Sequence, residues 1–297
     1  MLRLRVRTGA IGRSSPGRYI IGRRIGKGGF GMVYRCTDVE DVDAQLAVKV
    51  LTTERPNQDR ATTLRKIEAE VETLREMQKC PRVVRLVDCF EDGDSVQVVM
   101  QLCAGGDLAT VLDDSGPVGE ATLARVAVQV LEVLRSCHAS GIVYADVKPA
   151  NLCLLAAPLQ SGLLSPPFDI ATVDFGCSGA AGNRMRGTTP FMAPEVFKGG
   201  LTFKSDLWSL GVTLYLLYTA RLPFWDDTPL RLITTGMTLG RLHDSASSMP
   251  VLTARLAGLS PEGVDFILAC LAKNCEDRPS ADVALAHPWL RLDHGSG

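Results

Sequence analysis

Short runs of apolar and β-branched residues dominate the chain between positions 19 and 102. These runs read YIIGRRI (19–25), GMVYRCT (31–37), LAVKVL (46–51), VVRLVDCF (83–90) and SVQVVMQL (95–102). The stretch 60–78, which lies between them, lacks this pattern and is rich in helix-forming residues. Because β-branched runs of this length are typical of strands, the region is predicted to form an antiparallel sheet with a single helix.

The pattern changes near residue 104. In the stretch 120–140, and in further segments as far as Trp289, apolar residues recur at helical spacing, first at Leu123, Val126, Val130, Leu134 and Cys137. The long apolar run 207–220 is shorter than the roughly 20 residues that a bilayer span needs, so we interpret it as a buried core helix and expect no transmembrane segment. The chain is therefore predicted to be α+β, with a small sheet lobe at 19–103 and a larger, mainly helical lobe at 104–293.

The composition is that of a globular, enzyme-sized chain. Of 297 residues, 46% are hydrophobic and 22% charged, and a formal net charge of −1 gives no general attraction to nucleic acid or membranes. The first 37 residues contain nine basic and no acidic side chains. We interpret residues 1–18 as a basic, disordered tail in preference to an organelle transit peptide. Nine cysteines without the paired spacing of a zinc site favour reduced thiols and a cytoplasmic location.

Three glycines in the stretch IGKGGFGMVY form a G-x-G-x-x-G pattern: Gly26, Gly28 and Gly31. Alone the pattern is weak, because glycines also mark plain hairpins and dinucleotide sites. A dinucleotide site should continue into a helix, whereas MVYRCT has the character of a returning strand. We therefore expect a glycine-rich hairpin whose backbone N–H groups can approach a phosphate, since no Cβ intervenes.

A lone lysine, Lys49, lies within the apolar run LAVKVL. Burying an ammonium group is costly unless a partner compensates its charge. Glu70, in the predicted helix that follows, could hold this ammonium while it contacts nucleotide phosphates. By itself, Glu70 would equally suit a solvent-facing position on that helix.

Four polar residues further along the chain supply what phosphoryl transfer needs. Asp146, Lys148 and Asn151 form a D-x-K-x-x-N pattern, and Asp174 opens a D-F-G sequence after a strand-like run. The reaction requires a carboxylate near the attacking hydroxyl, a cation on the transferred phosphate, and oxygen ligands for magnesium.

With these motifs in order, the chain resembles the catalytic domain of the eukaryotic protein kinases, of the Ser/Thr type. The resemblance covers about residues 19 to 293 and continues through GTTPFMAPE (187–195), SDLWSLGVTLY (205–215) and EDRPSADVALAHPWL (276–290). It implies the two-lobed kinase fold. The chain looks most like the calcium/calmodulin-dependent group, which includes the plant-type calcium-dependent kinases. Because no calmodulin-binding helix or calcium-loop pattern follows residue 290, we expect no calcium control within this chain.

The resemblance assigns roles to individual residues, with ATP and Mg²⁺ as cofactors. Asp146 would accept the proton of the substrate hydroxyl, Lys148 would steady the γ-phosphate, and Asn151 and Asp174 would bind magnesium. Thr188 and Glu195 would belong to the activation segment and substrate platform, where Thr188 would link the platform to Asp146 and Lys148 and Glu195 would pair with Arg278. Asp206 would anchor the catalytic loop. The implied nucleotide site comprises Gly26, Gly28, Gly31, Val33, Ala47, Lys49, Glu70, the gatekeeper Met100, the hinge residues Gln101 and Cys103, and Asp107 at the ribose.

The chain departs from the usual kinase pattern at Tyr144 and Ala145, which replace the His and Arg before the catalytic Asp. The His position has a packing role that an aromatic ring can fill, so we expect catalysis to survive. The Arg at this position normally binds a phosphate on the activation segment. The segment 177–186 contains one hydroxyl, Ser178, and no acid. We therefore expect activity without phosphorylation there; if phosphate did control the segment, Arg184 or Arg186 would be the nearest candidates to receive it.

Two further departures concern substrates. Kinases selective for basic residues carry acids at several positions; Asp107 is retained here, but the positions of two further acids hold Ala150 and Leu216, which predicts weak basophilic selectivity. The stretch 156–169 is longer than a tight strand connection needs, and we interpret it as a tolerated surface insertion in preference to a docking element.

The function predicted from the sequence is transfer of the γ-phosphate of ATP to Ser or Thr hydroxyls of protein substrates, by a monomeric enzyme. The alternatives are a nucleotide-binding pseudokinase scaffold, which loss of Lys49, Asp146 or Asp174 would have favoured, and a small-molecule kinase, which would lack GTTPFMAPE.

Overall fold

The computed structural model describes residues 12–13, 17–28, 31–54, 58–157, 164, 167–182, 185–224 and 248–291. The chain divides into two compact units, one made of residues 1–102 with 174–176 and the other of residues 103–173 with 177–297. The division thus falls after Leu102, one residue before the expected lobe boundary. It also assigns the short segment Asp174–Gly176 to the first unit, which a division into continuous stretches did not anticipate.

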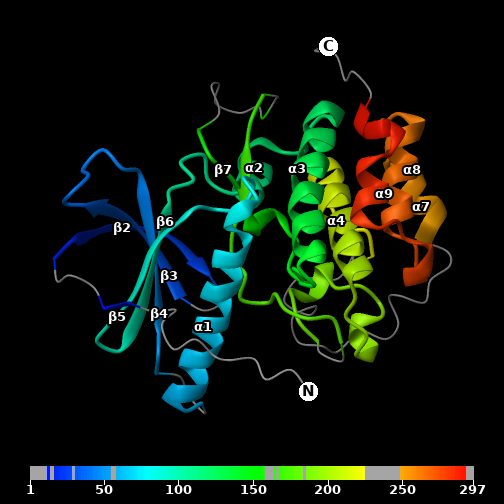
Figure 1. Ribbon diagram of the computed structural model, residues 1–297. Coiled ribbons are helices and arrows are strands. Elements are labelled where there is room, and N and C mark those ends of the chain that lie inside the picture. The colour runs from blue at the N-terminus through cyan, green and yellow to red at the C-terminus, as the bar shows by residue number, and fades with distance from the viewer. Residues whose placement is uncertain are drawn as a thin grey trace. The chain divides into compact units, whose positions relative to one another are not determined.

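The first unit is built on one sheet (Figure 1). Its strand order is β1-β5-β6-β4-β3-β2. The pairs among β2 to β6 are antiparallel, as the sequence predicts. The strand bounds are β1 Gly12–Arg13, β2 Tyr19–Gly28, β3 Gly31–Asp38, β4 Leu46–Thr52, β5 Leu86–Asp92 and β6 Ser95–Gln101.

The short strand β1 lies within residues 1–18, which we interpret from the sequence as a disordered tail. Gly12 and Arg13 pair in parallel with Phe90 and Glu91 of β5. Without β1, strand β5 would be the edge of the sheet, and its backbone groups on that side are available for pairing. The remainder of the expected tail, apart from Gly17 and Arg18, lies outside the described residues.

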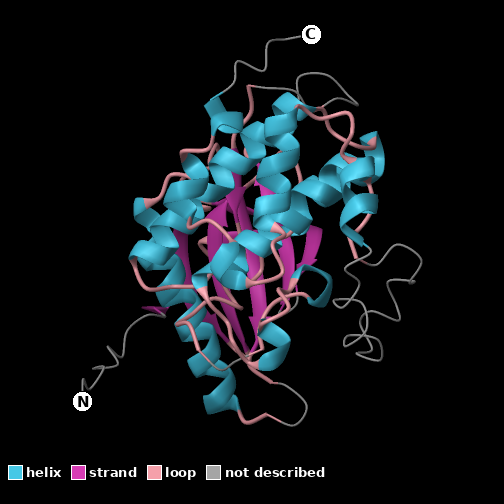
Figure 2. Cartoon of the chain, turned by 90° about the vertical axis from the view of Figure 1, so that its right-hand side faces the viewer, coloured by secondary structure: helices cyan, strands magenta, loops and turns pink. Residues whose placement is uncertain are grey.

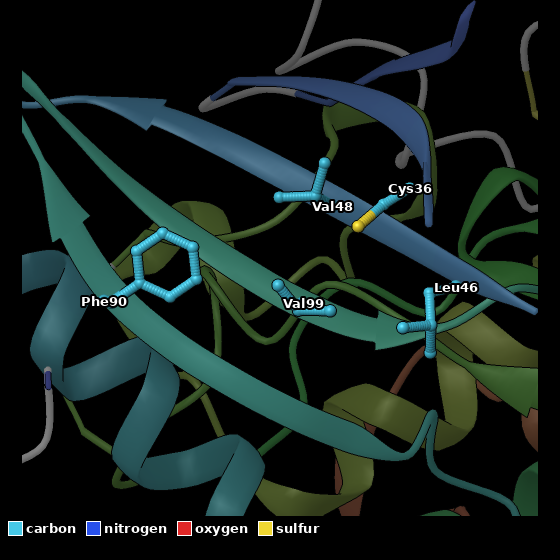
Figure 3. Close-up of a cluster of buried hydrophobic side chains, with 5 residues drawn as sticks. All are labelled: Cys36, Leu46, Val48, Phe90 and Val99. Carbon is cyan, nitrogen blue, oxygen red and sulfur yellow. The ribbon is translucent and has the colours of Figure 1, made fainter. Parts of the chain in front are cut away.

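The two faces of this sheet differ in what they carry. One face holds a buried apolar cluster drawn from four strands: Cys36, Leu46, Val48, Phe90 and Val99 (Figure 3). Because side chains alternate along a strand, Lys49 lies on the opposite face, where it pairs in register with Val33 and Val98. The alternation of side chains along β4 therefore places Lys49 on the face opposite Leu46 and Val48.

Helix α1 (Arg60–Glu76) follows β4 along the chain and continues into the 3-10 turn η1 (Met77–Lys79). Its first turn is capped by Asp59, whose side chain accepts a hydrogen bond of 2.8 Å from the Thr62 N–H. The residues that it buries, Ile67, Val71 and Leu74, recur at helical spacing. The single helix predicted for this region is confirmed.

The second unit is mainly helical (Figure 2). Its only described sheet is the antiparallel pair β7–β8. Helix α3 packs against α4 and α9 (Figure 1), and all five residues of its predicted apolar stripe are buried. The described elements are α2 Leu108–Ser115, α3 Glu120–Ala139, η2 Pro149–Asn151, β7 Leu152–Leu154, β8 Ile170–Thr172, η3 Thr189–Phe191, η4 Val196–Lys198, α4 Phe203–Thr219, α7 Ser248–Arg255, α8 Pro261–Cys270, η5 Cys275–Asp277, α9 Ala281–Leu285 and η6 Pro288–Arg291. The predicted α+β class, with a small sheet lobe and a larger helical lobe, is confirmed.

Helix α4 is the buried core helix predicted from the apolar run. It begins after a capping box in which Thr202 and Ser205 exchange hydrogen bonds with each other's backbone, and most of its residues are buried. Among the described residues, no helix combines the length and the apolar character that crossing a bilayer demands.

The described part of the 156–169 insertion is attached to α3. Leu164 is buried, and its carbonyl accepts a hydrogen bond of 2.7 Å from the Thr122 hydroxyl. Arg125 donates to the carbonyl of Phe168 at 3.2 Å and to the carboxylate of Asp169 at 3.0 Å. These described residues of the insertion are therefore part of the packed structure of the second unit.

Candidate active site

The glycine-rich stretch forms the predicted hairpin between β2 and β3. Gly26 lies opposite Val33, and Gly28 lies opposite Gly31. A Cβ on Gly31 would collide with the backbone carbonyl oxygen of Val50 in the neighbouring strand. Glycine at position 31 is thus required for the close approach of β3 to β4, and the continuation into a strand excludes the helix that a dinucleotide site would need.

Lys49 is buried among acidic partners within the first unit. Its Nζ donates to Glu70 Oε1 at 2.7 Å and to Asp174 Oδ1 at 3.0 Å, and only 5% of the residue is exposed. Burial alone would lower the pKa of Lys49, but the carboxylates of Glu70 and Asp174 outweigh it and raise the pKa above its usual value. The expected Lys49–Glu70 pair is confirmed, and the ammonium group remains charged at neutral pH.

Asp174 adopts an unusual backbone conformation. Its φ is +61°, in the left-handed region that non-glycine residues rarely occupy. One carboxylate oxygen, Oδ1, binds Lys49 and also accepts the Gly176 N–H at 3.3 Å. Strain of this kind persists where surrounding contacts impose it and is common at functional sites.

The residues expected to surround adenine lie at the end of β6 and just beyond it. Met100 pairs in register with Ala47 of β4, and the Gln101 N–H donates to the Arg85 carbonyl at 2.9 Å. Cys103 begins the second unit, where its thiol is hydrogen-bonded to Cys153.

That hydrogen bond lowers the pKa of the Cys103 thiol, against the effect of burial, and it raises the pKa of Cys153. Cys153 was not a predicted site residue. Its place two positions after Asn151 was the only sequence signal that could have drawn attention to it.

Asp107 caps helix α2. Its Oδ1 accepts hydrogen bonds of 3.0 Å from the backbone N–H groups of Ala109 and Thr110, and its Oδ2 accepts one of 3.1 Å from the Thr110 hydroxyl. This is the ordinary role of aspartate at a helix N-terminus. Contact of Asp107 with a ribose stays a prediction.

A compact polar cluster surrounds Asp146 in the second unit. The Thr188 hydroxyl donates to Asp146 Oδ1 at 2.6 Å, and the Lys148 ammonium donates to Asp146 Oδ2 at 2.8 Å and to Thr188 Oγ1 at 2.7 Å. Asn151 Nδ2 donates to Oδ2 of the same carboxylate at 3.0 Å and to the Asp146 carbonyl at 2.9 Å. Both carboxylate oxygens are therefore oriented, and the predicted link between Thr188, Asp146 and Lys148 is confirmed.

The backbone before Asp146 is fastened to α4. Asp206, which is fully buried, accepts hydrogen bonds from the N–H groups of Tyr144 at 3.0 Å and Ala145 at 2.8 Å, and its Oδ2 lies 2.9 Å from His138 Nε2. Ala145 has a φ of +67°, so these contacts hold it in the left-handed region. The expected anchoring role of Asp206 is confirmed; His138 was not predicted to take part.

Tyr144 fills the position where kinases usually have His. The residue is buried, and its hydroxyl donates to the Val173 carbonyl at 2.6 Å. An aromatic side chain with a paired hydroxyl therefore fits the interior at this point, in agreement with the packing role expected for this position.

Glu195 forms the predicted pair with Arg278. Arg278 donates through Nη1 and Nη2 to the two carboxylate oxygens at 2.7 and 2.9 Å, and Ser205 donates to Oε1 at 2.8 Å. Burial alone would raise the pKa of Glu195, but the hydrogen bonds and charge of Arg278 outweigh it and hold the pKa below its usual value. The pair is bidentate, which is the strong form of an arginine–carboxylate contact.

The residues present suit the predicted magnesium nucleotide. Asn151 uses its amide nitrogen in both hydrogen bonds given above, so its amide oxygen is the group left for a metal. Amide and carboxylate oxygens are the hard donors that Mg²⁺ prefers; the second unit carries such an amide at Asn151, and the first unit carries a carboxylate at Asp174. The bare glycine backbone of the hairpin and the charged Lys49 suit phosphate oxygens.

The sequence model described as "Protein kinase domain" matches residues 19–290. The chain belongs to the protein kinase family. The match covers both units of this kinase and includes every residue assigned above to the nucleotide, the metal or the proton.

The curated relatives of this kinase include several plant proteins named as calcium-dependent. Calcium-dependent protein kinase 32 of Arabidopsis thaliana is 31% identical over 295 residues, covering 98% of this chain and 52% of the relative. Calcium-dependent protein kinase 8 of Arabidopsis thaliana is 34% identical (92% and 49%), and Calcium-dependent protein kinase 22 of Oryza sativa subsp. japonica is 31% identical (92% and 46%). The chain spans about half the length of the curated relatives it matches.

Proposed function

We propose that this kinase transfers the γ-phosphate of ATP to Ser and Thr hydroxyls of protein substrates. The observation that carries the proposal is the cluster in which Thr188 and Lys148 orient both oxygens of the Asp146 carboxylate. An acceptor hydroxyl needs a positioned base of this kind. The charged Lys49, held by Glu70, supports the same conclusion because it supplies a cation for nucleotide phosphates.

Each of these residues has a defined task in the proposed reaction. Asp146 orients the acceptor hydroxyl and takes its proton, while Lys148 stabilises negative charge on the transferred group. Lys49 fixes the phosphates of the nucleotide, and Asn151 and Asp174 provide oxygen ligands for magnesium. Bound Mg²⁺ would neutralise phosphate charge as it is redistributed during transfer.

The proposed acceptors are Ser and Thr in preference to Tyr. Lys148 lies where Ser/Thr kinases place their lysine, and Thr188 bonds both Lys148 and Asp146 in the way that the resemblance to these kinases implies. A short acceptor side chain suits this arrangement. Phosphotyrosine as the main product on a peptide library would contradict the assignment.

We further propose that the substrates need no run of basic residues. Asp107, the acid that is retained, already accepts three hydrogen bonds in capping α2, and Ala150 and Leu216 carry no charge. A degenerate peptide array would test this preference. The monomeric state, the cytoplasmic location and the lack of calcium or calmodulin control within this chain belong to the proposal as predictions.

The test of the proposed function is incubation with Mg-ATP and a mixed pool of proteins, comparing the wild type with Lys49→Met and Asp174→Ala. We expect labelled phosphate in substrate proteins with the wild type and at least a 100-fold lower rate with either variant, because each lacks a charge needed at the phosphates or the metal. A wild type that binds nucleotide but transfers no phosphate would instead identify a scaffold.

A further inference from the structure

The activation segment carries an arginine that bonds to the segment's own backbone. Arg186 Nη1 donates to the carbonyl oxygen of Ser178 at 2.6 Å and approaches that of Cys177 at 3.4 Å. A Cβ on Gly179 would collide with the same guanidinium group. Arg186 therefore links position 186 to residues 177–178 of the same segment, and the absence of a side chain at Gly179 leaves room for the guanidinium group.

The part of the segment held by Arg186 also pairs with the backbone that leads to the catalytic Asp. Gly179 and Val143 exchange two hydrogen bonds of 3.0 and 2.8 Å. The Ser178 hydroxyl donates to the Tyr144 carbonyl at 3.0 Å. Residues 177–179 thus lie between the guanidinium of Arg186 on one side and residues 143–144 on the other.

The far end of the segment meets the same stretch of backbone. Gly187 has a φ of +105°, and a Cβ there would collide with the carbonyl oxygen of Ala145. The next residue along the chain, Thr188, donates a hydrogen bond to Asp146. Both ends of the segment are consequently seated on residues 143–146, and Arg186 connects the two ends.

We propose that Arg186 is a positioning residue that holds the described ends of the activation segment, residues 177–179 and 186–188, in this arrangement without any phosphate, and that a phosphate on Ser178 would disrupt it. The inference rests on the proposed function and adds the regulation of the same site. In this arrangement, hydrogen bonds from Arg186 to two backbone carbonyl groups take the ordering role that a phosphate on the segment would otherwise have.

The alternative is that Arg186 binds a phosphate once the segment is phosphorylated, as arginines near activation segments commonly do. The contacts oppose this. The hydroxyl of Ser178 acts as a donor toward the Tyr144 carbonyl, and phosphorylation would replace that donor with charged acceptor oxygens facing another acceptor. Ala145 offers no cation to compensate the added charge, and the Arg186 guanidinium already donates to the carbonyl oxygens of Ser178 and Cys177.

The first experiment compares Arg186→Gln with Lys198→Gln, which removes the same charge from an exposed position in η4. We expect Arg186→Gln to lower kcat at least tenfold with little change in the KM for ATP, and Lys198→Gln to stay within threefold of the wild type. Arg186→Lys, which keeps the charge and one donor direction, should recover part of the loss. Equal kcat values for Arg186→Gln and the wild type would overturn the inference.

Hydrogen exchange gives a readout that does not depend on activity. In Arg186→Gln, backbone amides of residues 177–182 and of Val143 should exchange at least tenfold faster, while amides of α3 and α4 remain unchanged. Unchanged exchange at these positions would refute the role of Arg186 even if activity fell. If the wild type itself transfers no phosphate, the proposed function fails, and the exchange comparison still decides whether Arg186 holds the segment.

The second experiment addresses Ser178, with Ser178→Ala as the reference because it loses the hydroxyl without gaining charge. Ser178→Ala, and wild-type protein made without an upstream kinase and treated with phosphatase, should stay within threefold of the untreated enzyme. Ser178→Glu should lose at least tenfold in kcat relative to Ser178→Ala. A tenfold fall after phosphatase treatment, or an activity of Ser178→Glu above that of Ser178→Ala, would show that phosphate activates the segment.

Discussion

At the scale of single residues, the buried arginine Arg278 depends on Glu195. The Arg278 side chain has no exposed surface, and its guanidinium lies 5.0 Å from the ring centre of Trp208. Removing one partner of a buried ion pair leaves the other charge uncompensated, which is more costly than the pair is favourable. The pair therefore affects stability mainly through the cost of leaving Arg278 buried without its counter-charge when Glu195 is removed.

We expect Glu195→Gln to lower the free energy of unfolding by about 3–5 kcal/mol at pH 7, because Arg278 loses its counter-charge. Since the pKa of Glu195 is held below its usual value of 4.5, the carboxylate's contribution is fully present above pH 4.5 and is lost as the pH falls through the folded-state pKa. The difference between wild type and variant should therefore be the same at pH 7 and pH 5 and shrink below pH 4.5. Urea unfolding at several pH values measures it.

The control is Glu276→Gln, which removes a carboxylate that is 80% exposed and lies 3.4 Å from Lys204. Exposed pairs contribute about 0–1 kcal/mol, so this variant should unfold almost as the wild type does. Equal losses for Glu195→Gln and Glu276→Gln would contradict the account of the buried pair.

The contacts among the residues of the D-x-K-x-x-N motif could be predicted from the sequence because the motif is local. The spacing from Asp146 to Asn151 places three polar side chains on one short loop, and the structure brings their atoms within hydrogen-bond distance. The bonds of Arg186 to the carbonyls of Cys177 and Ser178, and the contact between Cys103 and Cys153, could not be predicted in this way. They depend on how a loop folds back or on residues distant in sequence, which no spacing encodes.

At the scale of elements, the glycine-rich hairpin is shaped by close contact between strands. Of its first and last motif glycines, only Gly31 lies where a Cβ would strike backbone atoms of β4, whereas a Cβ on Gly26 would meet Val33 Cβ at an ordinary 3.7 Å. The motif therefore combines one position where glycine is sterically required with one where a side chain could be accommodated.

We expect Gly31→Ala to lower the free energy of unfolding by about 1–3 kcal/mol, because β3 must move away from β4 to admit the methyl group. Gly26→Ala should change it by less than about 0.5 kcal/mol. Denaturant unfolding of the two variants provides the comparison. A larger loss for Gly26→Ala than for Gly31→Ala would show that the hairpin contacts are not those described.

The elements with a clear hydrophobic period were predictable, and the irregular ones were not. The stripe of α3 and the apolar run of α4 were identified from spacing alone, because burial of one face or of a whole helix leaves a strong pattern. Strand β1 has only two residues, and its pairing with β5 depends on an available sheet edge. Such short strands leave no periodic signal.

At the scale of the whole molecule, the residues proposed to act in transfer are divided between two units. Lys49, Glu70 and Asp174 belong to the first, and Asp146, Lys148 and Asn151 to the second. Neither unit alone contains a complete set, so the proposed activity requires the chain as a whole.

The most direct test of the central claim is the rate at which wild type and Asp146→Asn transfer γ-phosphate from Mg-ATP to a Ser/Thr/Tyr peptide library. Asparagine keeps the shape of the side chain but cannot accept the proton, so we predict phosphoserine and phosphothreonine with the wild type and a rate at least about 100-fold lower with the variant. Circular dichroism should show the variant folded. Equal rates for the two proteins would contradict the account.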